Sequence, residues 1–259
     1  MSEPNVLYTT EGSVATITLN RPTVLNALNR DLMLELRQCF ERARDDANVR
    51  AIVLTGAGRG FASGADLGGG GGQRMDSGTT LRTLYHPVIT MMREMPKPIV
   101  AAVNGVAAGA GMSLVMACDI ILAGQSASFL QAFSRIGLIP DAGATWFLPR
   151  LVGDMRARAL AILADQIPAD EAQRLGIVWK VFADDQLMAE AGKMAGKLST
   201  MPTRAYAMIK QTLNATHANS LADQLELEAL LQTEAGRTED FAEGVAAFRE
   251  KRPAQFKGR

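Results

Sequence analysis

Hydrophobic and polar positions repeat with two different periods along this chain, and these periods predict where strands and helices lie. Residues 5–9 and 14–20 flank a Glu11–Gly12 turn, and the second stretch alternates as a half-buried strand does. From Asn29, a residue type that favours helix N-caps, one apolar face follows at helical spacing. Its members are Leu32, Leu36, Cys39, Phe40 and Ala43.

Strand-like and helix-like segments then alternate. Residues 49–58, 98–103 and 120–124 are typical of buried strands, whereas 79–95 and 109–117 are typical of helices, the first with an irregularity at Pro87. The alternation continues to about residue 182 and predicts an α/β fold. After Leu187 only helical patterns follow, so we expect an α/β core over residues 1–187 and a helical C-terminal region over 188–259.

The uncharged stretch between Lys97 and Asp119 is long enough to cross a bilayer. Pro98, Asn104–Gly105 and two further glycines divide it into a short strand and a helix, so a buried core segment is the better interpretation and no membrane contact is expected. The polar N-terminus has no signal-peptide pattern, and the two cysteines have no redox or metal spacing. We therefore expect a cytoplasmic protein.

The charge balance and the absence of several motifs exclude some classes of function. Lys+Arg and Asp+Glu both number 27, so no basic field predicts nucleic-acid binding. Neither glycine cluster completes a dinucleotide fingerprint, no G-x-S-x-G elbow is present, and His86 and His217 have no ligands at metal spacing. The glycine run at 68–72 lacks a P-loop lysine and is interpreted as a mobile loop. No metal site is predicted.

Two junctions of very small residues remain as candidates for chemistry: FASGADL at 61–67 and NGVAAGAGMSL at 104–114. Small side chains let a ligand approach main-chain N–H groups, and the second junction opens a helix whose first N–H groups lack intrahelical partners. Two such donors that converge on one carbonyl oxygen form an oxyanion hole. The alternative is close helix–sheet packing without a ligand.

One carboxylate stands out in GLIPDAGATW, where Asp141 follows Pro140 among small, apolar and aromatic residues. Pro-Asp-x-Gly is ordinary turn chemistry, so a structural turn aspartate is one interpretation. The other is a general base whose pKa is raised by Phe133, Ile139 and the Trp146–Phe147 pair.

The segments FASGADL, AAVNGVAAGAGMSLVMACDIILA, IGLIPDAGATWFLPRLVG and TLNRPTVLNAL together resemble the enoyl-CoA hydratase/isomerase (crotonase) superfamily over nearly the whole chain. The resemblance implies a spiral of repeated ββα units, a helical C-terminal trimerisation region that forms a homotrimer or a dimer of trimers, and an acyl-CoA substrate. No cofactor is implied beyond the coenzyme A of that substrate.

The resemblance also implies roles for individual residues. Ser63 and Ala110 would give the oxyanion N–H groups, and Lys257 would reach a CoA phosphate of its own or a neighbouring subunit. Tyr85 and His86 lie on a predicted helix that is expected to flank the acyl pocket, and Pro140 is expected to contact the substrate. The path for the CoA nucleotide and pantetheine would be lined by Val24, Leu25, Ala27, Ala65, Asp66 and Leu67.

The sequence departs from the hydratases of this superfamily at both of their catalytic glutamates, whose positions hold Ser113 and Phe133. Asp141 and its surroundings resemble instead the branch that converts ring-epoxide CoA esters to oxepin-CoA in phenylacetate degradation and shifts double bonds in enoyl-CoA esters. We therefore predict a CoA-ester isomerase with Asp141 as acid/base. A hydratase, a dehalogenase or thioesterase with Asp141 as nucleophile, and a non-catalytic acyl-CoA-binding protein stay open as alternatives.

Overall fold

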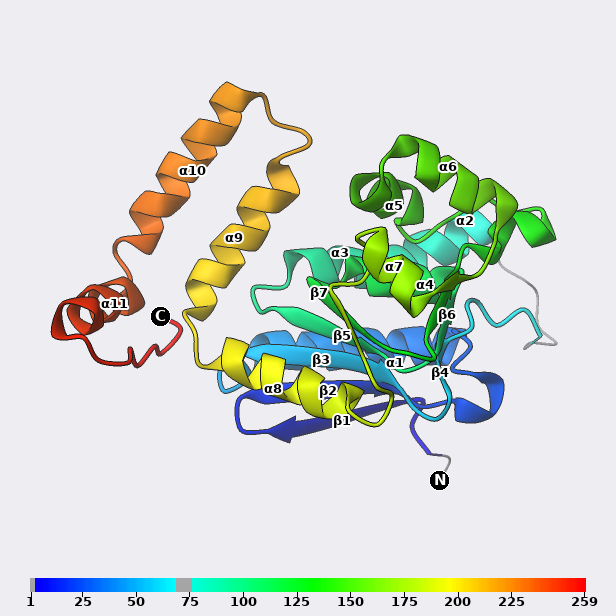
Figure 1. The fold of residues 1–259 in the computed structure, drawn as a ribbon, viewed down its shortest axis with the longest axis horizontal. Helices are drawn as coiled ribbons and strands as arrows, with labels where there is room; N and C mark the ends of the chain where they lie inside the picture. Colours follow the sequence, from blue (N-terminus) through cyan, green and yellow to red (C-terminus); the bar gives the residue numbers. More distant parts are fainter. Residues whose placement is uncertain (1–2, 69–75) are drawn as a thin grey trace.

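The computed structural model describes residues 3–68 and 76–259, and its centre is a large six-stranded sheet (Figure 1). The strand order is β1-β2-β3-β5-β7-β10. The strands are β1 (Val6–Glu11), β2 (Val14–Leu19), β3 (Ala51–Gly56), β5 (Ile99–Val103), β7 (Ile120–Gly124) and β10 (Lys180–Phe182). The β1–β2 hairpin is antiparallel and every other pair is parallel, so β2, β3, β5 and β7 all end at one edge.

A second, smaller sheet lies beyond that edge, in the order β4-β6-β8-β9. Its strands are β4 (Gly60–Ala62), β6 (Val106–Ala108), β8 (Ser128–Leu130) and β9 (Ile167–Pro168). β4, β6 and β8 directly follow β3, β5 and β7 and pair in parallel, and a helical segment follows each of them. This repeated ββα unit confirms the predicted α/β spiral.

Helices cover both faces of the large sheet. α1 (Arg30–Asp45) and α3 (His86–Glu94) pack on one face, and α8 (Leu187–Ser199) packs on the other. In β3 the side chains of Ile52 and Leu54 face the first layer, while Val53 faces α8. Burial on both faces explains why these strands are continuously apolar.

Shorter helical elements complete the core: α2 (Ser77–Thr80), a π-helical turn (Leu81–Tyr85), α4 (Ala110–Ala117), α5 (Ala144–Val152), α6 (Asp154–Leu163), α7 (Ala169–Arg174) and 3₁₀ turns at Pro22–Val24 and Ala132–Ile136. The irregularity expected at Pro87 lies earlier, in the π-helical turn. Pro87 is the second residue of α3, which continues the π-helical turn without a break, so the missing N–H of Pro87 interrupts the hydrogen bonding of one continuous helix.

The C-terminal region is helical, as predicted. α8 packs on the sheet, and the three helices that follow project from the core, as Figure 1 shows. These are α9 (Thr203–Ala215), α10 (Leu221–Ala235) and α11 (Glu239–Glu250), and we call them the C-terminal arm. A partly buried ion pair between Lys210 Nζ and Asp119 Oδ2, at 2.8 Å, anchors α9 to the core.

The uncharged stretch that could have crossed a bilayer is divided, as expected, into β5, β6 and α4. Within residues 3–68 and 76–259, no helix is long and apolar enough to span a membrane. Of the glycine run at 68–72, all but Gly68 lies outside the described residues.

Candidate active site

The two glycine-rich junctions meet just after β4 and β6, where β6 leads into α4. A Cβ atom on Gly111 would lie 2.4 Å from the carbonyl oxygen of Ala62. One on Gly64, whose φ is +101°, would lie 3.1 Å from the carbonyl oxygen of Ala108. Only glycine permits this approach of the two backbones. The two junctions therefore lie against each other, and the convergence of their N–H groups on one oxygen stays a prediction.

The N–H group of Ala110 lies at the start of α4. Gly109 occupies the N-cap with φ +51° and supplies no side-chain cap. The first N–H groups of a helix have no acceptor within it and lie at the positive end of its dipole. The prediction that Ala110 donates to a thioester oxygen thus has a structural basis.

Ser63, the second predicted donor, already donates its hydrogen bonds to other residues of the protein. Its N–H donates to the carbonyl oxygen of Leu25 at 2.9 Å, and its hydroxyl donates to the carbonyl oxygen of Val24 at 3.2 Å. In this conformation Ser63 cannot offer its N–H to a substrate, which corrects the expectation taken from the resemblance.

Ala65 fits the donor role better. Leu28 and residues 64–66 bond as neighbouring parallel strands do: the N–H of Leu28 donates to Gly64 at 2.8 Å, and the N–H of Asp66 donates to Leu28 at 3.1 Å. The exposed Ala65 between them has no acceptor for its N–H among the described residues. A sequence position predicted only to line the substrate path therefore has the geometry of a donor.

The loop that receives the Ser63 N–H has a constrained backbone. Leu25 and Asn26 have φ values of +51° and +55°, in the left-handed region that non-glycine residues rarely adopt. The buried Asn26 side chain holds the loop, because Nδ2 donates to the carbonyl oxygens of Ala57 at 3.0 Å and Gly60 at 2.8 Å. Of the predicted path residues on this loop, Val24 is exposed, Leu25 half-buried and Ala27 buried.

Asp66, in the first junction, is joined to this loop by an ion pair with Arg21. Its Oδ2 accepts a hydrogen bond from Arg21 Nη1 at 2.8 Å, and the same nitrogen donates to the carbonyl oxygen of Ala27 at 2.5 Å. Leu67, next along the chain, is exposed. Asp66 is therefore placed at the predicted path as a structural ion-pair partner.

Asp141 is a half-buried carboxylate with an unusual environment. Its Oδ1 is buried and has no hydrogen-bond partner among the described residues, and burial raises the pKa of its carboxyl group to about 6. A shift of this kind brings a carboxylate into the range where it works as a base near neutral pH. The half-buried Pro140 directly precedes it.

The aromatic and aliphatic neighbours expected to bury Asp141 divide into two groups. Phe133 and Phe147 are buried, and Phe147 contacts the turn after Asp141, since a Cβ on Gly143 would lie 2.6 Å from its ring. Ile139 is 79% exposed and Trp146 is 38% exposed, so their predicted part in the burial of Asp141 is not supported.

Tyr85 lies beside the site, at the end of the π-helical turn. Its hydroxyl donates to the carbonyl oxygen of Leu28 at 3.2 Å. Burial, followed by the negative charges of Asp141 and Asp66, raises the pKa of this phenol. Tyr85 is therefore close to both carboxylates, as expected for a residue that flanks an acyl pocket. π-Helical turns occur frequently at functional sites.

Lys257 is not brought to this site within one chain. Its Nζ lies 3.6 Å from Glu239 Oε2, beside α11. The preceding carbonyl oxygen, of Phe256, accepts a hydrogen bond from Arg50, directly before β3 begins. The glycine-rich junctions follow the opposite ends of the parallel strands. The predicted contact of Lys257 with CoA would thus need a neighbouring subunit and stays a prediction.

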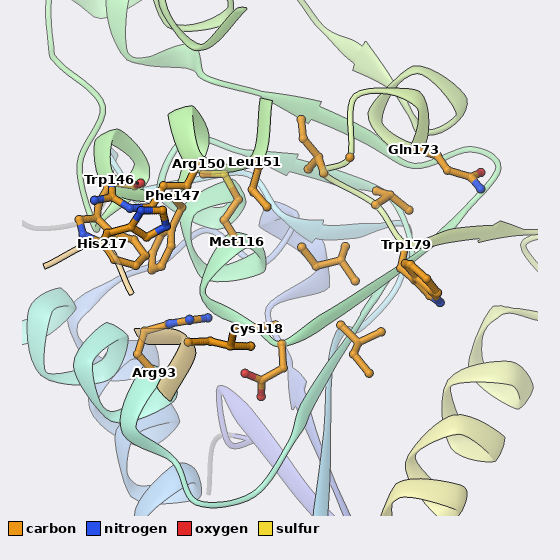
Figure 2. Close-up of a pocket in the computed structure, with 17 residues that line it drawn as sticks. Arg93, Met116, Cys118, Trp146, Phe147, Arg150, Leu151, Gln173, Trp179 and His217 are labelled. Carbon is orange, nitrogen blue, oxygen red and sulfur yellow. Dashed lines mark hydrogen bonds between the residues drawn. The ribbon is translucent and has the colours of Figure 1, made fainter. Parts of the chain in front are cut away.

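A groove of about 900 Å³ lies elsewhere, between the core and α9. Figure 2 shows Trp146, Phe147, Arg150 and His217 gathered on one side of it and Trp179 and Gln173 on the other. None of the predicted site residues lines it, and its one carboxylate, Asp119, is paired with Lys210. Among the described residues, no three His, Cys, Asp or Glu side chains gather as metal ligands.

Comparisons with known proteins show the family and the fold of this chain. The Enoyl-CoA hydratase/isomerase family profile matches residues 9–259. A probable enoyl-CoA hydratase of Rhodobacter capsulatus is 48% identical over all of both chains, and the 1,2-epoxyphenylacetyl-CoA isomerase of Escherichia coli is 43% identical over 98% of both. A putative enoyl-CoA hydratase structure from Streptomyces coelicolor, 38% identical, superposes with a TM-score of 0.93 over 98% of this chain and 94% of its own. The chain belongs to the enoyl-CoA hydratase/isomerase family.

Proposed function

We propose that this protein isomerises acyl-CoA esters, with Asp141 as the acid/base. The observation that carries the proposal is the Asp141 carboxylate itself, which has a buried, unpartnered oxygen and a pKa raised to about 6. It lies on a segment hydrogen-bonded to the first turns of α4, where the N–H of Ala110 is available. The N–H groups of Ala65 and Ala110 form the oxyanion hole in this proposal.

The reaction moves a proton and needs no water. For a 3-enoyl-CoA, the Asp141 carboxylate takes a proton from C2, and the electron pair moves onto the thioester oxygen held by the two N–H groups. The protonated carboxyl group then returns the proton at C4 while the double bond forms between C2 and C3. Substrate and product have the same atoms, and no oxidant or reductant takes part.

The proposed substrate class is supported by the relative at 43% identity, which is named 1,2-epoxyphenylacetyl-CoA isomerase. We propose ring-epoxide CoA esters and 3-enoyl-CoA esters as the two substrate types, and phenylacetate degradation as the setting. In both reactions the product has the same atoms as the substrate, so neither needs water or a redox partner, and the carboxylate-mediated proton transfer described above applies to the 3-enoyl-CoA esters.

Hydration is the second candidate, because the relative at 48% identity is named a probable enoyl-CoA hydratase. Hydration adds a hydroxyl group from water to one carbon of the double bond and a proton to the other. The active site must therefore position a water molecule and a proton donor. Ser113 and Phe133 stand where the hydratases have glutamates; the Ser113 hydroxyl already bonds to the main chain of Asp141, and Phe133 has no polar atom. Isomerisation is therefore the better supported reaction.

We further propose that the protein forms a homotrimer or a dimer of trimers in the cytoplasm through the C-terminal arm, in which Leu225 and Leu230 of α10 are exposed. A double Leu225→Glu, Leu230→Glu variant should be monomeric by light scattering at micromolar concentration. A monomeric unmodified protein would refute the assembly.

The function is tested with a panel of CoA esters analysed by mass spectrometry. Turnover of a 3-enoyl-CoA or of epoxyphenylacetyl-CoA should greatly exceed hydration of crotonyl-CoA. Asp141→Asn should lower isomerisation by about 10²-fold or more, the usual scale for loss of a general base, with unchanged binding of a CoA ester.

Crotonyl-CoA hydration with a kcat on the order of 10 s⁻¹ or above, or near-normal turnover by Asp141→Asn, would overturn the proposal. Hydrolysed or dehalogenated products would instead identify Asp141 as a nucleophile, and binding without turnover of any ester would identify a non-catalytic protein.

A further inference from the structure

Ser113 is a fully buried serine on α4, one helical turn after Ala110. Its Oγ lies 2.9 Å from the carbonyl oxygen of Asp141 and 3.3 Å from that of Gly109. A hydroxyl group has one proton to donate. The shorter distance assigns that proton to Asp141, which lies 28 positions further along the chain.

The segment that carries Asp141 has an unfavourable backbone conformation, which the Ser113 hydrogen bond helps to hold. Ala142 has a φ of +49°, and Gly143 follows with +85°, so two consecutive residues adopt the left-handed conformation. For a non-glycine residue this conformation costs roughly 1–2 kcal/mol. The Asp141 carbonyl oxygen also accepts the N–H of Ala144 at 2.9 Å, a bond within the same turn. The Ser113 hydrogen bond instead joins the turn to α4.

The geometry points to Ser113 as a positioning residue that holds the Asp141 turn against the helix whose first N–H group, that of Ala110, forms part of the oxyanion hole. This inference rests on the proposed function. Because Ala110 and Ser113 belong to one rigid helical turn, the hydroxyl fixes the base relative to the place where negative charge develops. Displacing a catalytic group by about 1 Å can cost on the order of 10²-fold in rate.

The test is Ser113→Ala in the full-length protein, assayed with the ester that the unmodified protein isomerises best. We expect kcat to fall by roughly 10- to 100-fold, while KM changes by no more than about twofold because the N–H groups that bind the thioester remain. The freed turn should let water reach the carboxylate. The pKa of Asp141 then falls toward its ordinary value, and the acid limb of kcat against pH moves to lower pH.

Two further variants make the result specific. Ser199→Ala is the matched control, since Ser199 is also buried and its hydroxyl donates to a backbone carbonyl oxygen, that of Gly196, at 2.9 Å in α8. It should lower the melting temperature without changing kcat or the pH profile. Ser113→Cys keeps a weak donor of similar size, so its kcat should lie between those of the unmodified protein and Ser113→Ala.

The outcomes separate this inference from the proposed function. An inactive Asp141→Asn together with an unchanged kcat and acid limb in Ser113→Ala would overturn the positioning role and leave the proposed function intact. A loss of rate in Ser113→Ala that merely follows a lower melting temperature, with an unmoved acid limb, would also overturn it. An active Asp141→Asn would remove the proposed base and the inference with it.

Discussion

Helices α4 and α10 are stabilised in opposite ways. All eight residues of α4 are buried, and its N-cap Gly109 provides no side-chain hydrogen bond. No residue of α10 is buried, and a capping box between Ser220 and Asp223 begins that helix. Packing thus fixes the helix that carries the proposed chemistry, whereas the helix in the C-terminal arm is held by its N-terminal capping box and by exposed contacts with α9. A substitution should therefore change the free energy of unfolding more in the buried core around α4 than on the exposed surface of the C-terminal arm.

The largest effect is expected where the arm meets the core. Lys210→Met would leave Asp119 partly buried without its cation, although the Asp119 carboxylate would still accept the N–H of Ile99 at 2.8 Å. We expect a loss of about 3 kcal/mol in the free energy of unfolding, measured by urea titration. Adding Asp119→Asn should recover part of that loss. A loss below about 1 kcal/mol for the single variant would show that the arm is not anchored here.

Gly111→Ala is the next test, because the new Cβ would overlap the backbone of Ala62 within the core. It should cost about 2–3 kcal/mol of stability and lower activity, since α4 must shift. Gly192→Ala in α8 is the control: no atom lies within 4 Å of its new Cβ. Because alanine favours helices, this variant should gain roughly 0.5–1 kcal/mol. Equal effects at the two glycines would show that close packing at Gly111 does not fix α4.

Asp141→Asn should be more stable than the unmodified protein at neutral pH. The carboxyl group has a pKa of about 6 in the folded chain against an ordinary value of 3.8. Its contribution is therefore fully present below pH 3.8 and lost as the pH rises through 6. After solvent screening, the variant should gain about 1 kcal/mol above pH 7, with a smaller gain near pH 4. Thermal melts at both pH values measure this, and a pH-independent difference would refute it.

The smallest effect is expected at the outer surface of the arm. Arg204 Nη2 lies 2.5 Å from Glu234 Oε1, joining α9 to α10, and both side chains are about half exposed. Arg204→Ala should change the free energy of unfolding by less than about 1 kcal/mol, and added salt should reduce that change further. A loss as large as that of Lys210→Met would show that this pair, too, is structurally required.

Much of the fold is predictable from local patterns. Two strands and a helix are expected from residues 5–45, and β1, β2 and α1 are found there, with Asn29 Oδ1 accepting the N–H of Leu32 at 2.9 Å as an N-cap. The small sheet is harder to predict. Its strands have two or three residues, too few to show a period, and their pairing depends on the spiral as a whole.

The candidate site, too, can be predicted only in part from the sequence. The importance of Asp141 could be inferred from its sequence surroundings and the family resemblance. The choice between Ser63 and Ala65 as donor could not, because it depends on one hydrogen bond to the carbonyl oxygen of Leu25. The left-handed backbone at Leu25 directs that carbonyl group, and nothing in the residue type predicts such a conformation.

The parallel order of the large sheet also has a consequence for folding kinetics. β3 pairs with β5, and β5 with β7, so each pair closes a long loop before its contacts form. Such non-local pairing is slow, whereas the contacts between α9 and α10 are local. On dilution from denaturant, the helical signal of the arm should return first. Catalytic activity should return last, because the site needs both sheets, α4 and the Asp141 turn together.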